Sequence, residues 1–198
     1  MSSSCTTKIC ITHENEDALK ELCNQIHFWT SETFTESKYD KSWLGNIVIG
    51  SQIGTIDTGE TTDVSCRGDL LGAKVSENML VIETVTAWSP KLQMWRLLVD
   101  KYLPDAAMIY CAEDKGNGIL STNDPDREDC YYIDPWEDVD GVDFDAEASE
   151  NTVRKILQGL LHTEEINIDT LLDLFEDSEY SNQMSIDKWE FDEIDAWD

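Results

Sequence analysis

The last fourteen residues, SIDKWEFDEIDAWD (185–198), combine carboxylates with large apolar side chains. Six of the fourteen are Asp or Glu, and Trp, Phe and Ile stand between them. Carboxylates bind cations, including the Lys and Arg side chains of other proteins, and Trp is enriched at the energetic hot spots of protein interfaces. The segment therefore predicts either a surface that binds a basic partner or a small hydrophobic cluster that charge keeps soluble.

A second acidic stretch, WEDVDGVDFDAE (136–147), is close to the calcium-binding loop of an EF-hand. Gly141 falls on the sixth position of such a loop and Glu147 on the twelfth, with two Asp residues at the third and fifth. Trp136, however, occupies the first position, where a carboxylate is needed. We therefore interpret the stretch as a solvated acidic loop, and weak calcium binding stays an open alternative.

These two segments supply the side chains that we expect to contact a partner protein. They are Asp138, Asp140, Asp143, Asp145, Glu147, Asp187, Trp189, Glu190, Phe191, Asp192, Glu193, Asp195 and Trp197. No cofactor and no resident metal ion are predicted.

The charge of the chain is unevenly distributed. The 198 residues hold 42 acids and 14 bases, for a net charge of −28. Residues 1–112 hold 15 acids and 9 bases, net −6, whereas residues 113–198 hold 27 acids and 5 bases, net −22. A field of this sign repels nucleic acid and anionic membranes and attracts basic surfaces. We expect a partner with a basic surface, and no direct binding of nucleic acid or membrane.

The cysteines and the N-terminus indicate a reduced, cytoplasmic protein. Six cysteines are present, none in a C-x-x-C pair, and their spacing matches no zinc or haem pattern. The N-terminus lacks the basic and apolar regions of a signal peptide. No apolar run approaches the roughly 20 residues that span a bilayer.

Motifs for catalysis are scarce. Neither a P-loop nor a dinucleotide-binding glycine pattern is present, and no histidine stands near an obvious nucleophile. We therefore predict that the chain is not an enzyme. One alternative is a metal-dependent enzyme that uses the carboxylates of residues 113–129, among them Glu113 and Asp124.

Hydrophobic periodicity predicts a strand–helix–strand–strand–helix–strand order in the first part of the chain. The predicted elements are a strand at 5–12, a helix at 13–26, strands at 67–75 and 78–88, a helix at 89–103 that begins at Ser89 and Pro90, and a strand at 106–113. This order is that of the split βαβ sandwich with a ferredoxin-like fold, in which two helices cover one face of an antiparallel sheet. The predicted class is α+β.

The remaining elements are shorter. Residues 129–135 read as one more strand, residues 151–162 and 168–180 as two helices, and the closing segment as a third helix. We expect a ferredoxin-like domain at 1–135 and an acidic, mainly helical extension at 136–198.

Part of the chain resembles a known family. The stretch TAWSPKLQMWRLLVDKYLPDAAMIYCAED, followed by GNGILSTNDPD and YYIDP, is similar to the YubB-like family of phage and plasmid proteins. The similarity covers about residues 40 to 135. It implies a ferredoxin-like fold and an origin in a mobile element, and it implies no activity.

Charge and resemblance together favour an inhibitor that mimics DNA. In this hypothesis the acidic surface binds the basic, nucleic-acid-binding surface of a host defence protein, such as a CRISPR or restriction effector. An alternative is a protein–protein adaptor whose acidic–aromatic tail is read mainly through its Trp and Phe side chains.

Overall fold

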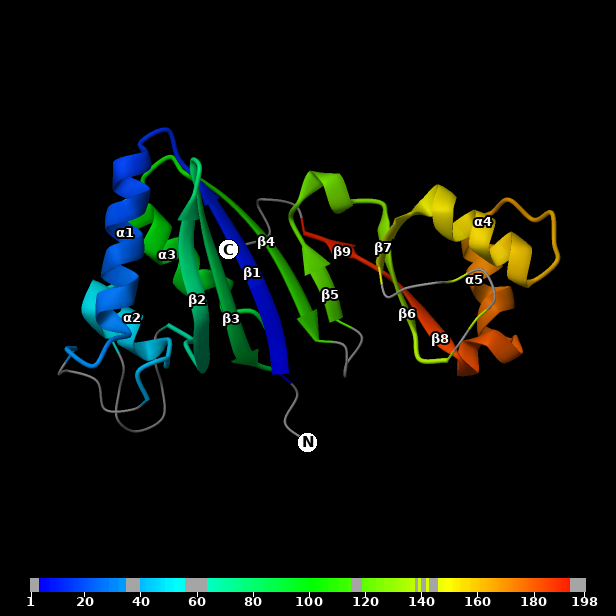
Figure 1. The fold of residues 1–198 in the computed structure, drawn as a ribbon, viewed down its shortest axis with the longest axis horizontal. Coiled ribbons are helices and arrows are strands. Elements are labelled where there is room, and N and C mark those ends of the chain that lie inside the picture. Colours follow the sequence, from blue (N-terminus) through cyan, green and yellow to red (C-terminus); the bar gives the residue numbers. More distant parts are fainter. Residues whose placement is uncertain are drawn as a thin grey trace. The chain divides into compact units, whose positions relative to one another are not determined.

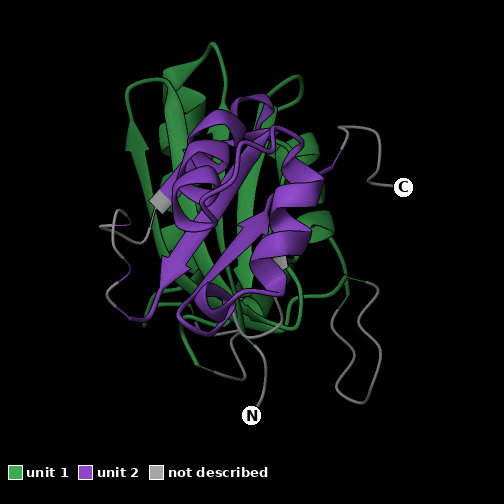
Figure 2. Cartoon of the chain, turned by 90° about the vertical axis from the view of Figure 1, so that its right-hand side faces the viewer, with its two compact units in different colours: residues 1–123, 193–198 green, residues 124–192 purple. Residues whose placement is uncertain are grey.

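The computed structural model describes residues 4–34, 40–55, 64–114, 119–137, 139, 142 and 146–192. These residues form two compact units, one that ends at Asn123 and one that runs from Asp124 to Asp192 (Figure 2). The predicted boundary after residue 135 falls later than this division, because strand β6 (Cys130–Pro135) pairs with strands of the second unit.

The first unit contains an antiparallel sheet. Its strands are β1 (Ser4–Thr12), β2 (Gly68–Ser76), β3 (Met79–Ala87), β4 (Ala107–Asp114) and β5 (Ile119–Thr122). They lie in the order β2-β3-β1-β4-β5, with β1 paired to both β3 and β4. In this register Ile9 of β1 stands opposite Ile82 on one side and Tyr110 on the other.

Three helices cover one face of this sheet: α1 (Glu16–Trp29), α2 (Gly45–Ser51) and α3 (Leu92–Tyr102) (Figure 1). Burial alternates along β1, where Cys5, Thr7, Ile9 and Ile11 face the helices and their neighbours do not. Alternate residues of a strand point to opposite faces, so the period-two pattern of the sequence selects the buried face. The predicted α+β class with a mainly antiparallel sheet is confirmed.

Helix α3 begins later than its sequence predicts. The residue that caps its start is Lys91, and the first helical residue is Leu92. Ser89 and Pro90 do not start the helix, because the backbone N–H of Ser89 donates to the Ala87 carbonyl (2.9 Å) and closes a tight turn.

The second unit is a small α+β structure. Strand β6 lies between β7 (Ala146–Ser149) and β8 (Met184–Lys188), and both pairings are antiparallel. Helices α4 (Glu150–Leu160) and α5 (Ile168–Glu176) pack on this sheet. The core consists of Tyr131, Ile133, Val139, Val142, Ala148, Val153, Leu157, Leu160, Leu171, Phe175 and Met184.

The prediction of a third helix in the closing segment is wrong for the residues of that segment that the structure describes. Residues 184–191 form β8 and the short strand β9 (Glu190–Phe191). Ile186 stands opposite Ile133 of β6, so the backbone of β8 finds its hydrogen-bond partners in a distant strand. The part after residue 135 is therefore mixed α and β within the described residues, whereas we predicted a mainly helical extension.

Candidate functional site: the acidic surface of residues 124–192

Acidic side chains far outnumber basic ones in the second unit. Residues 124–192 include 22 acids and 4 bases, for a net charge of −18. Three of the four bases already pair with carboxylates: Arg127 with Glu147 (2.8 Å), Lys188 with Asp129 (3.6 Å), and Arg154 with Glu150. Internal pairing therefore neutralises only a few of the acids.

A series of exposed acids lies on and just after α5. Leu171 and Phe175 are buried in the core, and this orientation turns Asp169, Asp173 and Glu176 to solvent. At 1.5 Å of rise per residue, Asp169 and Asp173 are about 6 Å apart along the helix axis, and Asp173 and Glu176 are about 4.5 Å apart. Asp177 and Glu179 continue the exposed series. We call these five acids, at 169, 173, 176, 177 and 179, the α5 acidic stripe.

The start of α5 is well anchored. The side-chain oxygen of Asn167 accepts a hydrogen bond from the Thr170 backbone N–H (2.9 Å). The Glu165 carboxylate accepts from the backbone N–H groups of Asn167 (2.9 Å) and Ile166 (2.8 Å). These hydrogen bonds lower the pKa of Glu165 from its ordinary value, because they favour the charged form. The stripe therefore begins at a helix end with a defined conformation.

The acidic loop at 136–147 lies partly outside the described residues, and so do Asp138, Asp140, Asp143 and Asp145. Glu147 is exposed and pairs with Arg127. Val139 and Val142 are buried in the core of the second unit. The two valines thus tie positions 139 and 142 of this stretch to the core.

The residues predicted in the tail have different surroundings. Glu190 is exposed, while Asp187, Phe191 and Asp192 are half-buried; Asp187 accepts a hydrogen bond from the Ser185 hydroxyl (2.8 Å). Trp189 is only 2% exposed, and the Arg127 guanidinium lies 5.3 Å from the centre of its ring. Glu193, Asp195 and Trp197 lie outside the described residues. In this arrangement the ring of Trp189 is not available to a partner.

Trp136 presents its ring to solvent instead. It is 57% exposed, and its indole N–H donates to the Asn182 carbonyl (2.9 Å), which fixes the orientation of the ring. Sequence reasoning did not include Trp136 or the α5 acidic stripe among the site residues. The alternation of acids with apolar residues at helical spacing in 168–176 is the signal that could have identified the stripe.

The carboxylates of the enzymatic alternative do not form a metal site in the part of the chain that the structure describes. Glu113 is half-buried on β4, and Asp124 pairs with Arg127 (3.7 Å). Among the described residues, no group of three or more His, Cys, Asp or Glu side chains is placed to hold a metal ion. No helix in the described ranges has the length and apolar character needed to cross a membrane.

Comparison of the chain with protein-family models, with curated proteins and with solved structures gave no match.

Proposed function

We propose that this chain is a non-enzymatic inhibitor that acts as an anionic decoy. In this proposal residues 124–192 occupy the basic, nucleic-acid-binding surface of a host defence protein, such as a CRISPR or restriction effector. The observation that carries the proposal is the α5 acidic stripe, which exposes five carboxylates with no basic residue in the last turn of the helix. Lys and Arg side chains that bind DNA phosphates also form strong charge-assisted hydrogen bonds with carboxylates.

The position of the acids on α5 supports a binding role over a purely structural one. Asp173 and Glu176 lie near the C-terminal end of the helix, where the helix dipole disfavours negative charge by about 0.3–1 kcal/mol per group. Asp169 and Asp173 are four residues apart on one face, a spacing at which like charges also repel. A basic partner would offset both costs on binding. The attraction would act at long range and weaken as salt is added.

The test compares two variants that carry the same net charge. In the stripe variant, four acids of the α5 acidic stripe become amides: Asp169→Asn, Asp173→Asn, Glu176→Gln and Asp177→Asn. In the control variant, four exposed acids of the first unit become amides: Glu14→Gln, Glu77→Gln, Glu83→Gln and Asp105→Asn. Each full-length protein is immobilised and exposed to bacterial lysate, because phages and plasmids reside in bacteria. Bound proteins are then eluted with duplex DNA.

A decoy predicts that wild type and the control variant retain the same nucleic-acid-binding protein and that DNA releases it. The stripe variant should lose most of this retention. Equal retention by the stripe and control variants would show that net charge alone attracts proteins, and it would overturn the proposal. Retention that DNA does not release would overturn it as well.

The exposed ring of Trp136 favours a second candidate, a protein–protein adaptor. A rigid, half-exposed Trp next to acidic residues is a typical anchor of a protein interface. Under this candidate, Trp136→Ala should abolish capture of the partner and the stripe variant should retain it. The decoy predicts the reverse.

We also propose a ferredoxin-like fold for the first unit and an origin in a mobile element. The fold is supported by the strand order β2-β3-β1-β4 in the sheet. Along the chain, helix α1 connects β1 to β2 and helix α3 connects β3 to β4, which also supports it. The origin rests on the resemblance of residues 40–135 to the YubB-like family.

A further inference from the structure

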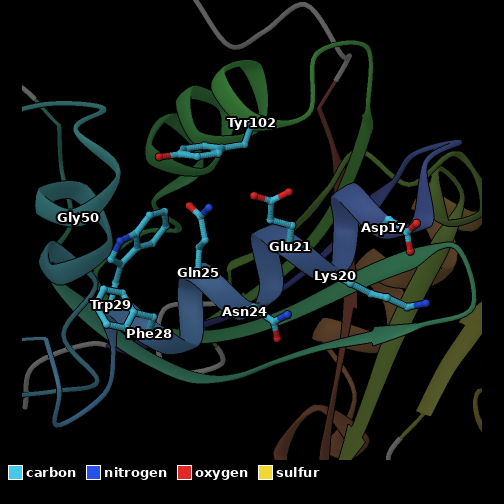
Figure 3. A pocket seen from close by; sticks show the side chains of 9 residues that line it. All are labelled: Asp17, Lys20, Glu21, Asn24, Gln25, Phe28, Trp29, Gly50 and Tyr102. Atoms are coloured by element: carbon cyan, nitrogen blue, oxygen red, sulfur yellow. The ribbon is translucent and has the colours of Figure 1, made fainter.

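A groove of about 600 Å³ lies on the first unit, between helices α1 and α3 (Figure 3). Gly50 of α2 closes one end of the groove, and Asp17 lies at the other. All of its lining residues belong to the first unit. The groove is therefore independent of the acidic surface proposed above.

Two aromatic rings form one wall of the groove. The ring centres of Trp29 and Tyr102 are 5.8 Å apart, and their planes meet at 63°, an edge-to-face contact. Trp29 can reach this position because Gly50 has no side chain: a Cβ there would lie 2.1 Å from the Trp29 ring. The Tyr102 hydroxyl donates to the Ser51 carbonyl (3.4 Å), which also accepts from Lys101 (2.6 Å). These contacts fix the positions of both rings.

Two polar side chains from the same helix as Trp29 lie opposite Tyr102. Glu21 and Gln25 are one helical turn apart on α1, and Figure 3 shows both pointing across the groove toward α3. Within the described residues neither side chain makes a hydrogen bond or an ion pair, although Gln25 is half-buried. The nearby Lys20 is held by Glu16 at 2.7 Å and does not pair with Glu21.

We propose that this groove binds the guanidinium group of an arginine side chain from a partner protein. A guanidinium is planar and cationic: it can donate two parallel hydrogen bonds to the Glu21 carboxylate and another to the Gln25 amide oxygen. Its faces stack on aromatic rings, and the half-buried Tyr102 ring supplies one, whereas Trp29 is buried and holds Tyr102 in place through their edge-to-face contact. A lysine ammonium would satisfy the carboxylate but has no planar face to stack on the Tyr102 ring. The net charge of −28 draws cations to the protein and so assists this binding.

The first experiment uses N-acetyl-L-arginine methylamide as the probe and the full-length, nitrogen-15-labelled protein. Titration should give saturable shifts of the backbone amide signals of Glu21, Gln25 and Tyr102. The matched probe is N-acetyl-L-citrulline methylamide, which has nearly the same shape and no charge. Its dissociation constant should be at least about tenfold larger, because a charge-assisted pair becomes a neutral one. Equal binding of the two probes, or shifts spread over the acidic residues of the whole chain, would overturn the proposal.

The second experiment separates the groove from the general negative charge. Glu21→Gln should weaken arginine binding at least about tenfold. Glu14→Gln removes one exposed carboxylate just before the same helix, outside the groove lining, and should change binding by less than about twofold. An equal effect of the two substitutions would sink the proposal. The stripe variant described above should bind the probe as wild type does, so the groove and the decoy can fail separately.

Discussion

The ammonium nitrogen of Lys91 lies 3.1 Å from the carbonyl oxygen of Ala87, in the turn that holds Trp88 at a φ of +66°. Ser89 donates its backbone N–H to the same carbonyl (2.9 Å), which makes this a γ-turn of the rare kind with positive φ. The Thr86 hydroxyl donates to the Ser89 carbonyl (2.9 Å) and ties the turn to strand β3. These hydrogen bonds stabilise a backbone conformation that a bulky aromatic residue rarely adopts.

The first prediction concerns the Thr86 hydroxyl. Thr86→Val removes the donor to the Ser89 carbonyl and should lower the free energy of unfolding by about 1–2 kcal/mol. Thr84 is the matched control, because it is buried on the same strand and its hydroxyl has no hydrogen-bond partner among the described residues. Thr84→Val should leave stability unchanged or raise it. Urea unfolding of both variants checks the difference, and equal losses would contradict it.

The second prediction concerns the contact between Gly50 and Trp29. Gly50→Ala places a methyl group in the indole ring and should cost about 1–3 kcal/mol, because the packed core cannot move away freely. Gly159 in α4 is the control, since a Cβ there meets nothing within 4 Å. Gly159→Ala should raise stability by about 0.5–1 kcal/mol through the better helix propensity of Ala. The melting temperatures of the two variants should shift in opposite directions.

The third prediction concerns the alkaline limit of stability. Burial raises the pKa of the Cys23 thiol above its ordinary value of 9.0, against a smaller opposite effect of the hydrogen bond with the Val75 backbone. The unfolded chain therefore loses this proton at a lower pH than the folded protein does. The stability linked to this proton is fully present below pH 9.0 and is lost as the pH rises toward the raised folded value.

The measurement is the free energy of unfolding at several pH values on both sides of 9.0. Cys23→Ala should show a shallower decline above this pH than wild type does. Comparing the two proteins cancels the contributions of other groups. One of these groups is Lys91: burial lowers its pKa, so its effect on stability has the opposite sign to that of Cys23. Parallel curves for the two proteins would show that Cys23 makes no such contribution.

The fourth prediction concerns Asn123, which is 3% exposed at the end of β5. Its amide nitrogen donates to the Met108 carbonyl (2.9 Å), and its amide oxygen accepts from the Tyr110 backbone N–H (2.8 Å). Asn123→Leu leaves the Met108 carbonyl and the Tyr110 N–H without their side-chain partner. This should lower the free energy of unfolding by about 2–4 kcal/mol. The exposed Asn151→Leu, as a control, should change it by less than about 0.5 kcal/mol.

Much of the fold follows from local pattern. The predicted strands at 5–12, 67–75, 78–88 and 106–113 correspond to β1, β2, β3 and β4, and the predicted helix at 13–26 corresponds to α1. Alternating and helical periodicities are written into consecutive residues, so they can be recognised without tertiary information. The same holds for α4 and α5, although the latter ends at Glu176, before the predicted residue 180.

The site was less predictable, because exposure is a property of the folded neighbourhood. Trp136 and Trp189 both stand among acids in the sequence, yet one is 57% exposed and the other 2%. The exposed one sits just after β6 and is held by Asn182, whereas the buried one lies beneath Arg127. Both partners are distant in sequence, so composition could not distinguish the two rings.

By itself the sequence determined the charge asymmetry, the α+β class and the main elements of the first unit, because net charge is a sum over residues and periodicity is local. Only the tertiary structure decided that residues 184–188 form a strand, since their hydrogen-bond partners lie in β6, about fifty residues earlier. It also decided which face of α5 carries the acids and that Tyr102 of α3 lies across a groove from Glu21 and Gln25 of α1. These relationships depend on contacts between segments far apart in the chain, which residue spacing does not encode.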